Sequence, residues 1–333
     1  MRDKYNIQER AYMNKTVFRN SLLLMLAATI WGTAFVAQSV GMDYVGPYTF
    51  NAIRNFIGCI VLLPFIFWMD KKDKKSYGND GDENPDMFAD KAAKDKGKGI
   101  CKKIDKKLII GGICTGTALC IASNLQQYGI MYTSVGKSGF ITALYIVLVP
   151  VFGLVIGHRQ SGRMWIAIAI AVVGMYFLCM TTGSFALQTG DIILLLCAAS
   201  FAVQILLIDH FSALVNPVKL AWCQFLVCGI LSSIPMFVLE HPTLSGIMGG
   251  WTSILYAGAL STGVAYTIQV VAQRGMNPAV ASLIMSLESV ISVIAGWLLL
   301  NQHLSSRELM GCLLMLVAII IVQLPEKREA CKD

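Results

Sequence analysis

Residues 277–305 have the sequence NPAVASLIMSLESVISVIAGWLLLNQHLS, in which Glu288 is the one acidic or basic side chain apart from a histidine. Residues 278–300 within it form an almost continuous apolar run. About 20 apolar residues, each rising 1.5 Å along a helix, cross the roughly 30 Å of hydrocarbon in a bilayer. The run therefore predicts a membrane-spanning helix, because backbone groups in lipid find no water partners and a barrel strand would be shorter and alternating.

Nine further apolar runs of this kind occur along the 333 residues, which are 56% hydrophobic and 14% charged with a mean hydropathy of +0.62. A soluble domain averages about 45–50% apolar and about 25% charged residues. The sequence therefore predicts an all-α integral membrane protein with ten transmembrane helices. The other nine expected spans are 21–40, 48–69, 108–131, 138–157, 163–181, 191–209, 217–239, 251–271 and 307–324.

The positive charges indicate an orientation. If the amino terminus is cytoplasmic, 24 of the 27 lysines and arginines lie on the inner side, and the ratio is still 12 to 2 without the loop 70–107. Both termini are therefore expected in the cytoplasm. Basic residues gathered in tails and one loop, rather than on a folded face, argue against a nucleic-acid partner. The loop holds 12 lysines and nine acids, so disorder is expected, with binding to anionic lipid as the alternative.

Two parts of the chain are similar to each other. Residues 133–161 align with 277–305 at an offset of 144, and near the front of each part Pro47 aligns with Pro217 at an offset of 170. The two offsets differ by 26 residues. This nearly matches the 27 residues by which the loop 70–107 is longer than its counterpart at 240–250. Shared apolar composition is the alternative explanation, but it does not account for the matched prolines and loop lengths.

The predicted organisation is thus a cytoplasmic segment (1–20), a first five-helix repeat (21–181), a second (190–324) and a cytoplasmic tail (325–333). Five helices are an odd number, so the second repeat would enter the membrane from the opposite side. Inverted repeats are typical of secondary transporters, whose substrate sites lie near the midplane between the halves.

The chain resembles the EamA-like family of the drug/metabolite transporter superfamily over about 21–324. The motifs that carry the resemblance are AATIWGTAFV (27–36), Arg54-Asn55-Phe56, Tyr132-Thr133-Ser134 with the following GFITALYIVLVP, and SLIMSLESVISVIAGWLLLNQHLS (282–305). The resemblance implies ten helices in two five-helix repeats.

The sequence departs from the family pattern in three places. Leu287-Glu288-Ser289 replaces Leu-Glu-Pro, a change expected to stiffen the ninth helix. Gly157-His158-Arg159 and Asn301-Gln302-His303 replace Gly-Glu-Arg, and the 70–107 insertion is unusual for the family. Because of these departures, the details of the family's mechanism transfer less directly to this chain, while the expected fold is unaffected.

Glu288 is the first candidate for the transport site. It lies too deep in its helix to reach either surface, and Ser282, Ser286, Ser289 and Ser292 surround it. Ionisable groups inside a bilayer are costly and are functional candidates for that reason. The carboxyl could bind a cationic group or, because burial disfavours its charged form, take up a proton. A structural hydrogen bond to a neighbouring helix is the alternative.

Further candidates lie in other spans. Arg54 either extends towards the outer surface or offers a positive fork to a carboxylate or to Glu288. Trp31 and Tyr145 either line a cavity or face lipid, and Pro64 and Pro150 act as hinges or as packing. Polar amides in apolar spans either bond across helices or form a polar path. These amides are Asn51, Asn124, Gln126, Gln127, Gln204, Gln224 and Gln269.

The sequence predicts a secondary transporter in the bacterial inner membrane, and the resemblance implies that it moves a small, amino acid-like or related polar metabolite by efflux or exchange. The predicted substrate-binding residues are Glu288, Arg54, Asn51, Gln126, Trp31, Tyr145, Gln204 and Gln269. No metal, cofactor or nucleic acid is expected. A substrate and membrane lipid are the expected partners, with homodimerisation left open. A non-transporting receptor or assembly subunit is the rival. An intramembrane enzyme would need a catalytic constellation that the motifs lack.

Overall fold

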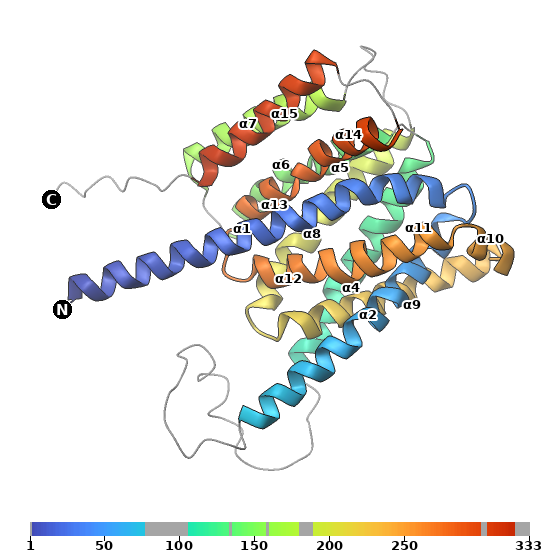
Figure 1. Ribbon diagram of the computed structural model, residues 1–333, viewed down its shortest axis with the longest axis horizontal. Coiled ribbons are helices and arrows are strands. Elements are labelled where there is room, and N and C mark those ends of the chain that lie inside the picture. Colours follow the sequence, from blue (N-terminus) through green and yellow to red (C-terminus); the bar gives the residue numbers. More distant parts are fainter. Residues whose placement is uncertain are drawn as a thin grey trace.

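The computed structural model describes residues 2–76, 106–132, 135–157, 160–179, 189–300 and 305–323. Within these ranges all regular structure is helical (Figure 1). The helices are α1 (Arg2–Gly41), α2 (Pro47–Ser76), α4 (Lys106–Ile130), α5 (Val135–Ala143), α6 (Tyr145–Val155), α7 (Gly162–Cys179), α8 (Thr189–Ser212), α9 (Pro217–Pro235), α10 (Leu244–Gly249), α11 (Trp251–Tyr256), α12 (Thr267–Gln273), α13 (Pro278–Met285), α14 (Leu287–Leu300) and α15 (Ser306–Gln323). Two π-helical segments, η1 (Met236–Glu240) and η2 (Ala257–Tyr266), continue α9 and α11.

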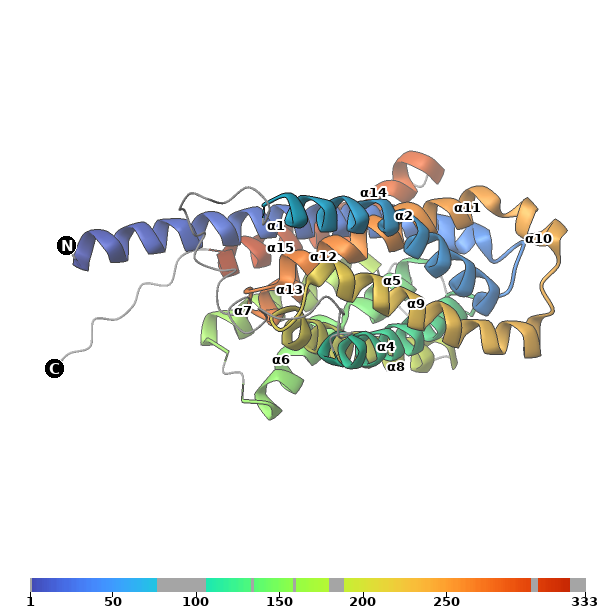
Figure 2. The ribbon, with the colours of Figure 1, turned by 90° about the horizontal axis from the view of Figure 1, so that it is seen from below.

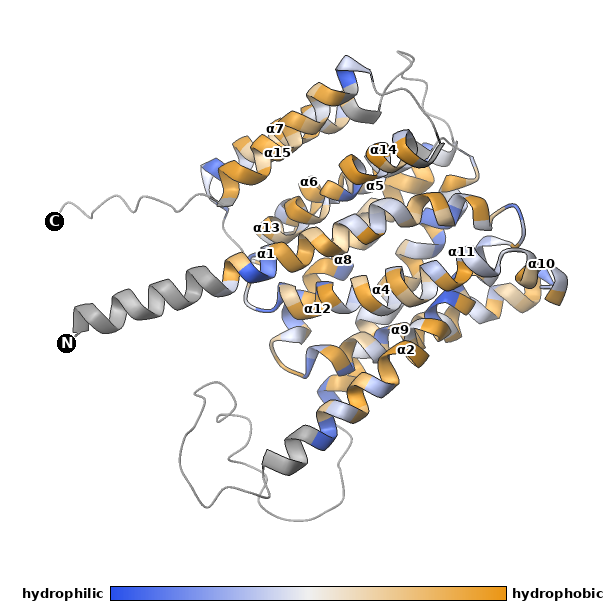
Figure 3. Cartoon of the chain, in the orientation of Figure 1, coloured by the Kyte–Doolittle hydropathy of each residue, from blue (hydrophilic) through white to orange (hydrophobic). Residues whose placement is uncertain are grey.

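Seven helical stretches of the described chain are long and apolar enough to cross a membrane. They are Thr16–Gly41, Pro47–Lys71, Lys106–Ile130, Thr189–Ser212, Pro217–Glu240, Trp251–Gln273 and Pro278–Ala295. The three other expected spans coincide with shorter apolar helices, Ile141–Val155, Gly162–Phe177 and Leu309–Val322. The chain is therefore a multi-pass membrane protein. Figure 3 shows the apolar colouring along these helices, and large apolar side chains such as Ile60 and Phe67 remain exposed where lipid would surround them.

The helices pack as a bundle with α1 and α2 above α4 and α8 in the view from below (Figure 2). α4 packs against both α8 and α9, α2 packs against α9, and α1 packs against α14, while α7 and α15 pair along one edge of the bundle (Figure 1). Glycines allow this close packing, because small residues let backbones approach within a membrane. A β-carbon on Gly174 would lie only 2.9 Å from the Gly311 carbonyl oxygen.

The expected fourth and ninth helices are each divided near their middle. α5 ends at Ala143 and α6 begins at Tyr145, while α13 ends at Met285 and α14 begins at Leu287. The ninth span is thus divided three residues before Ser289, and α14 continues through Ser289 without interruption. Beside the break, Ser282 Oγ and Ser286 Oγ donate to the Ala279 and Leu283 carbonyl oxygens, bonds that can compete with the backbone hydrogen bonds of the helix.

The two prolines do not interrupt their helices. Pro150 lies inside α6, beyond the break at Leu144, and α2 continues past Pro64 to Ser76. The expected hinge at Pro150 is thus displaced by six residues towards the amino terminus.

Helical structure extends beyond the expected spans in two places. Residues 2–20 are helical, because α1 begins at Arg2. Both ends of the loop 70–107, which was expected to be disordered, are helical, since α2 ends at Ser76 and α4 begins at Lys106. Residues 77–105 of that loop, the tail 325–333 and most of the two motifs at 157–159 and 301–303 lie outside the described residues.

Candidate functional site

A cavity lies between α1, α2, α4, α8, η2 and the two divided helices. About 460 Å³ inside it is free of protein atoms, but the part that the centre of a water molecule can occupy is only about 30 Å³. A water molecule needs at least about 10–15 Å³ measured in this way, so the cavity holds about two. The space is therefore too small in this conformation to hold a metabolite.

Six of the eight predicted site residues line this cavity, although they are far apart in the sequence. They are Trp31 of α1, Arg54 of α2, Gln126 of α4, Tyr145 of α6, Gln269 of α12 and Glu288 of α14. All six are buried. The structure therefore brings most of the polar residues that stand out in the apolar spans into one place.

The two helix breaks meet at the cavity. Tyr145 is the first residue of α6, Glu288 is the second of α14, and the tyrosine Oη donates to Glu288 Oε1 at 3.2 Å. Ser289 Oγ also donates to the Gly139 carbonyl oxygen of α5 at 3.4 Å. A carboxylate in the first turn of a helix is favoured by the partial positive charge of the helix amino terminus. The break in the ninth span thus creates, at the cavity, a helix start that suits Glu288.

Arg54 is buried in the cavity wall, and no acidic side chain of the described residues pairs with it. The side chain is 2% exposed, and its Nε has no hydrogen-bond partner among the described residues. The guanidinium carbon lies 5.9 Å from the centre of the Phe50 ring. Within the described chain no ion pair joins Arg54 to Glu288; Tyr266 is within electrostatic range of both. A buried charge is stabilised only when it is paired, so Arg54 has its charge available for an anionic ligand.

Aromatic side chains form one wall of the cavity. The Trp31 and Tyr266 ring centres are 4.8 Å apart, and Trp31 Nε1 donates to the Ser261 carbonyl oxygen of η2 at 3.3 Å. Tyr145 meets Phe201 edge to face with ring centres 6.5 Å apart. Trp31 therefore faces the cavity and not lipid, which decides between the two interpretations of this residue from the sequence.

Asn51 and Gln204 do not line the cavity. Asn51 Nδ2 donates to Asn124 Oδ1 at 2.8 Å and to the Ser123 carbonyl oxygen at 3.0 Å, so this amide joins α2 to α4. Gln204 is buried in α8, and neither atom of its amide has a hydrogen-bond partner in the described part of the protein. Asn51 thus fits the packing interpretation that the sequence left open.

Other lining residues were missed. Tyr266 could have been found by the criterion that selected Tyr145, a hydroxyl in the middle of an apolar span, and Gln38, Thr142 and Ser261 are polar groups near span ends or in the wall. The remaining apolar members give no signal in the sequence, because a lipid-facing position has the same composition. They are Phe35, Phe201, Ile205 and Met285.

Comparisons with known proteins agree with this architecture. A model of the EamA-like transporter family matches residues 19–180 and again residues 188–324. The chain is 30% identical to an uncharacterized transporter of Archaeoglobus fulgidus over 90% of its own length and 84% of the relative's. It is 22% identical to an uncharacterized transporter of Bacillus subtilis, covering 88% and 92% of the two chains.

Two proteins with lower sequence identity or coverage are also similar to this chain. The chain is 24% identical to a WAT1-related chloroplastic protein of Arabidopsis thaliana over 90% of its length and 68% of that protein. A solved crystal structure shares the fold with a TM-score of 0.68 and 16% identity, covering 91% and 96% of the two chains. With the family matched over most of its length, this chain belongs to the EamA-like transporter family.

Proposed function

We propose that the protein is a secondary transporter for a small zwitterionic metabolite of the amino acid class. The observation that carries the proposal is a buried arginine that no acidic residue of the described chain pairs with, in the same cavity as a buried carboxyl. Arg54 would bind the substrate carboxylate, since a guanidinium fork matches a carboxylate in geometry and charge. Glu288 would bind the amino group.

The transport cycle is proposed to be alternating access between two inverted five-helix repeats. Support comes from the two separate matches to the family, from the internal offsets and from seven long and three shorter apolar helices that together suit ten spans. The narrow cavity suits a closed intermediate, which would widen to one side or the other. The charge distribution supports cytoplasmic termini in the plasma membrane of a bacterium.

Glu288 supplies a means of coupling to a proton gradient. Tyr145 is its one hydrogen-bond partner among the described residues, and a carboxyl in this setting can hold a proton or the substrate amino group but not both. Competition of this kind would link outward movement of substrate to inward movement of protons. Efflux or exchange is the direction proposed.

The rival function, a receptor or assembly subunit without transport, predicts a continuous apolar core around Glu288. The cavity instead contains a guanidinium, hydroxyls and amides, which favours transport.

Counterflow in proteoliposomes tests the proposal. Vesicles with purified protein are loaded with an unlabelled mixture of amino acids, and uptake of labelled members is followed. We expect uptake of some labelled amino acids, and its abolition in Arg54→Met. Glu288→Gln should reduce exchange, because it removes the carboxylate that binds the amino group, and the exchange that remains should not respond to an imposed pH gradient. No uptake above that of empty vesicles for any amino acid would reject the substrate class, and an unchanged pH response in Glu288→Gln would reject the coupling.

A further inference from the structure

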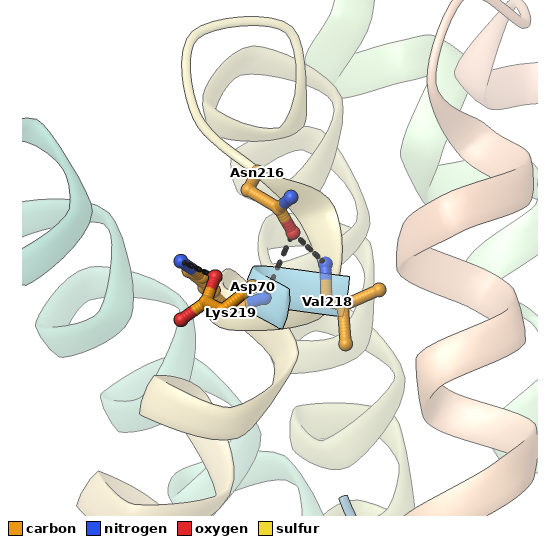
Figure 4. A network of polar contacts seen from close by, with 4 residues as sticks. All are labelled: Asp70, Asn216, Val218 and Lys219. Atoms are coloured by element: carbon orange, nitrogen blue, oxygen red, sulfur yellow. Dashed lines mark hydrogen bonds and ion pairs between the residues drawn. The ribbon is translucent and has the colours of Figure 1, made fainter. Parts of the chain in front are cut away.

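Polar contacts join α2 and α9 at both ends of their antiparallel packing. At one end Glu240, which closes η1, accepts from the backbone N–H groups of Tyr48 and Thr49 at 2.8 and 2.7 Å and from Thr49 Oγ1 at 2.7 Å. At the other end Lys219 Nζ lies 2.6 Å from Asp70 Oδ1 (Figure 4). We call these the Glu240 cap and the Asp70 ion pair.

The two contacts occupy equivalent positions in the two parts of the sequence. The offset of 170 that places Pro47 on Pro217 also places Thr49 on Lys219 and Asp70 on Glu240. Each contact therefore joins an acidic residue in the last turns of one helical span to the third residue of the other helix. The same relation appears twice, once in each direction along the pair.

The ends differ in how their helix starts are capped. The amino terminus of α9 has its own cap, since Asn216 Oδ1 accepts from the N–H groups of Val218 and Lys219 at 3.0 and 3.2 Å (Figure 4). Gly46 holds the equivalent position before α2 and has no side chain to offer. A β-carbon on Gly46 would lie 2.3 Å from the Glu240 carboxyl carbon, so the carboxylate fills the place of the missing cap.

The spacing of the contacts matches the membrane. Thr49 and Asp70 are 21 residues apart in α2, or about 32 Å at 1.5 Å per residue, close to the roughly 30 Å of hydrocarbon. The Lys219 and Asp70 side chains are 32% and 29% exposed, as expected at a boundary with water. An ion pair in this setting is weak and can break and reform readily.

Resting on the alternating access proposed above, we infer that the Glu240 cap and the Asp70 ion pair are the two gates of the transporter, both closed in this conformation. Opening towards one side breaks one contact while the other holds. Arg54 lies five residues beyond Thr49 on α2, so release of the Glu240 cap also frees the helix segment that carries the proposed carboxylate site. The ion pair would close the cytoplasmic side and the cap the external side.

Hydrogen–deuterium exchange of the purified full-length protein tests this inference without any substrate. Glu240→Ala should speed exchange at the Glu240 end and slow it at the opposite end by about two- to fivefold, the shift expected from losing a contact of this strength. The opposite end is followed in peptides around Ala272, whose carbonyl oxygen accepts from Asn20 Nδ2 and which takes no part in the Glu240 cap or the Asp70 ion pair. Lys219→Met should give the reverse pattern, and the double variant should return both ends towards the wild type.

Two controls keep the test decisive. Exchanging the charges, Asp70→Lys with Lys219→Asp, should restore wild-type exchange, and Glu240→Gln, which keeps an acceptor oxygen, should shift it in the same direction as Glu240→Ala but less. Faster exchange confined to the mutated end, with no slowing at the other, would show local fraying and overturn the inference. Reciprocal shifts in a protein that transports no amino acid would support the gates and reject the proposed substrate class.

Discussion

Replacing Arg54 with methionine should affect substrate binding and protein stability in opposite directions. Methionine has a similar length and no charge, so the change removes the guanidinium while largely preserving the volume of the cavity wall. Because Arg54 is 2% exposed and its Nε has no partner in the described structure, the native protein bears the cost of an unpaired donor, about 1–3 kcal/mol. The variant should therefore unfold at an equal or higher temperature than the wild type.

Binding should change far more. If a substrate carboxylate pairs with Arg54, removing one partner of a buried, hydrogen-bonded charge pair costs about 2–5 kcal/mol, a loss of affinity of about 30-fold or more. Arg54→Lys keeps the charge but not the fork and should lose less.

The assay is thermal unfolding in detergent, with and without the amino acids that drive counterflow. Wild-type protein should gain stability with ligand, and Arg54→Met should not, although its unfolding temperature without ligand is not reduced. A ligand-free variant clearly less stable than the wild type would refute the reasoning, since it would mean that Arg54 is paired within the protein. Retained stabilisation by ligand would refute the assignment of the carboxylate.

Three further predictions concern single contacts. Tyr145→Phe removes the donor to Glu288 and, with a bond to a charged group contributing about 1.5–3 kcal/mol, should change the pH dependence of exchange in proteoliposomes; an unaltered pH profile would count against the pair. Gly46→Ala should displace the Glu240 carboxylate and lower stability in thermal unfolding by about 0.5–2 kcal/mol, whereas Gly162→Ala, with open space around it, should be neutral; equal effects would contradict the cap. Gly174→Leu should separate α7 from α15 and destabilise by about 1–3 kcal/mol, visible as a lower unfolding temperature, and an unchanged temperature would show that this packing is not tight.

The positions of the apolar helices and most polar cavity residues were predictable from the sequence because the bilayer imposes a length and penalises polarity. A polar side chain in an apolar run must face protein, and Glu288, Arg54 and Gln126 follow that rule by lining one cavity. Asn51 obeys the same rule and nevertheless belongs to the α2–α4 contact. Hydropathy distinguishes protein from lipid, but it does not distinguish a cavity from a helix interface.

The helix breaks were not predictable from the prolines. The division at Ser286 lies beside serine hydroxyls that bond to carbonyl oxygens of their own helix, and the sequence alone does not show which serines bond in this way. Pro150, the residue most expected to break the fourth span, lies within α6. A membrane helix tolerates a proline where neighbouring groups bond to the carbonyl oxygen that the proline leaves without its N–H partner. The Glu240 cap could not be predicted from the sequence either, since 191 residues separate Glu240 from Thr49.

That separation has a consequence for synthesis. α9 carries its cap in its own sequence, but the amino terminus of α2 must wait for Glu240, which at about 5–20 residues per second leaves the ribosome roughly 10 to 40 s later. Throughout that interval the first turn of α2 depends on water or lipid headgroups for its hydrogen bonds. The first turn of α2 thus receives its hydrogen-bond acceptor only from the second half of the chain. A polypeptide that ends before residue 240 would lack this acceptor, and its uncapped second helix would be a target for membrane quality control.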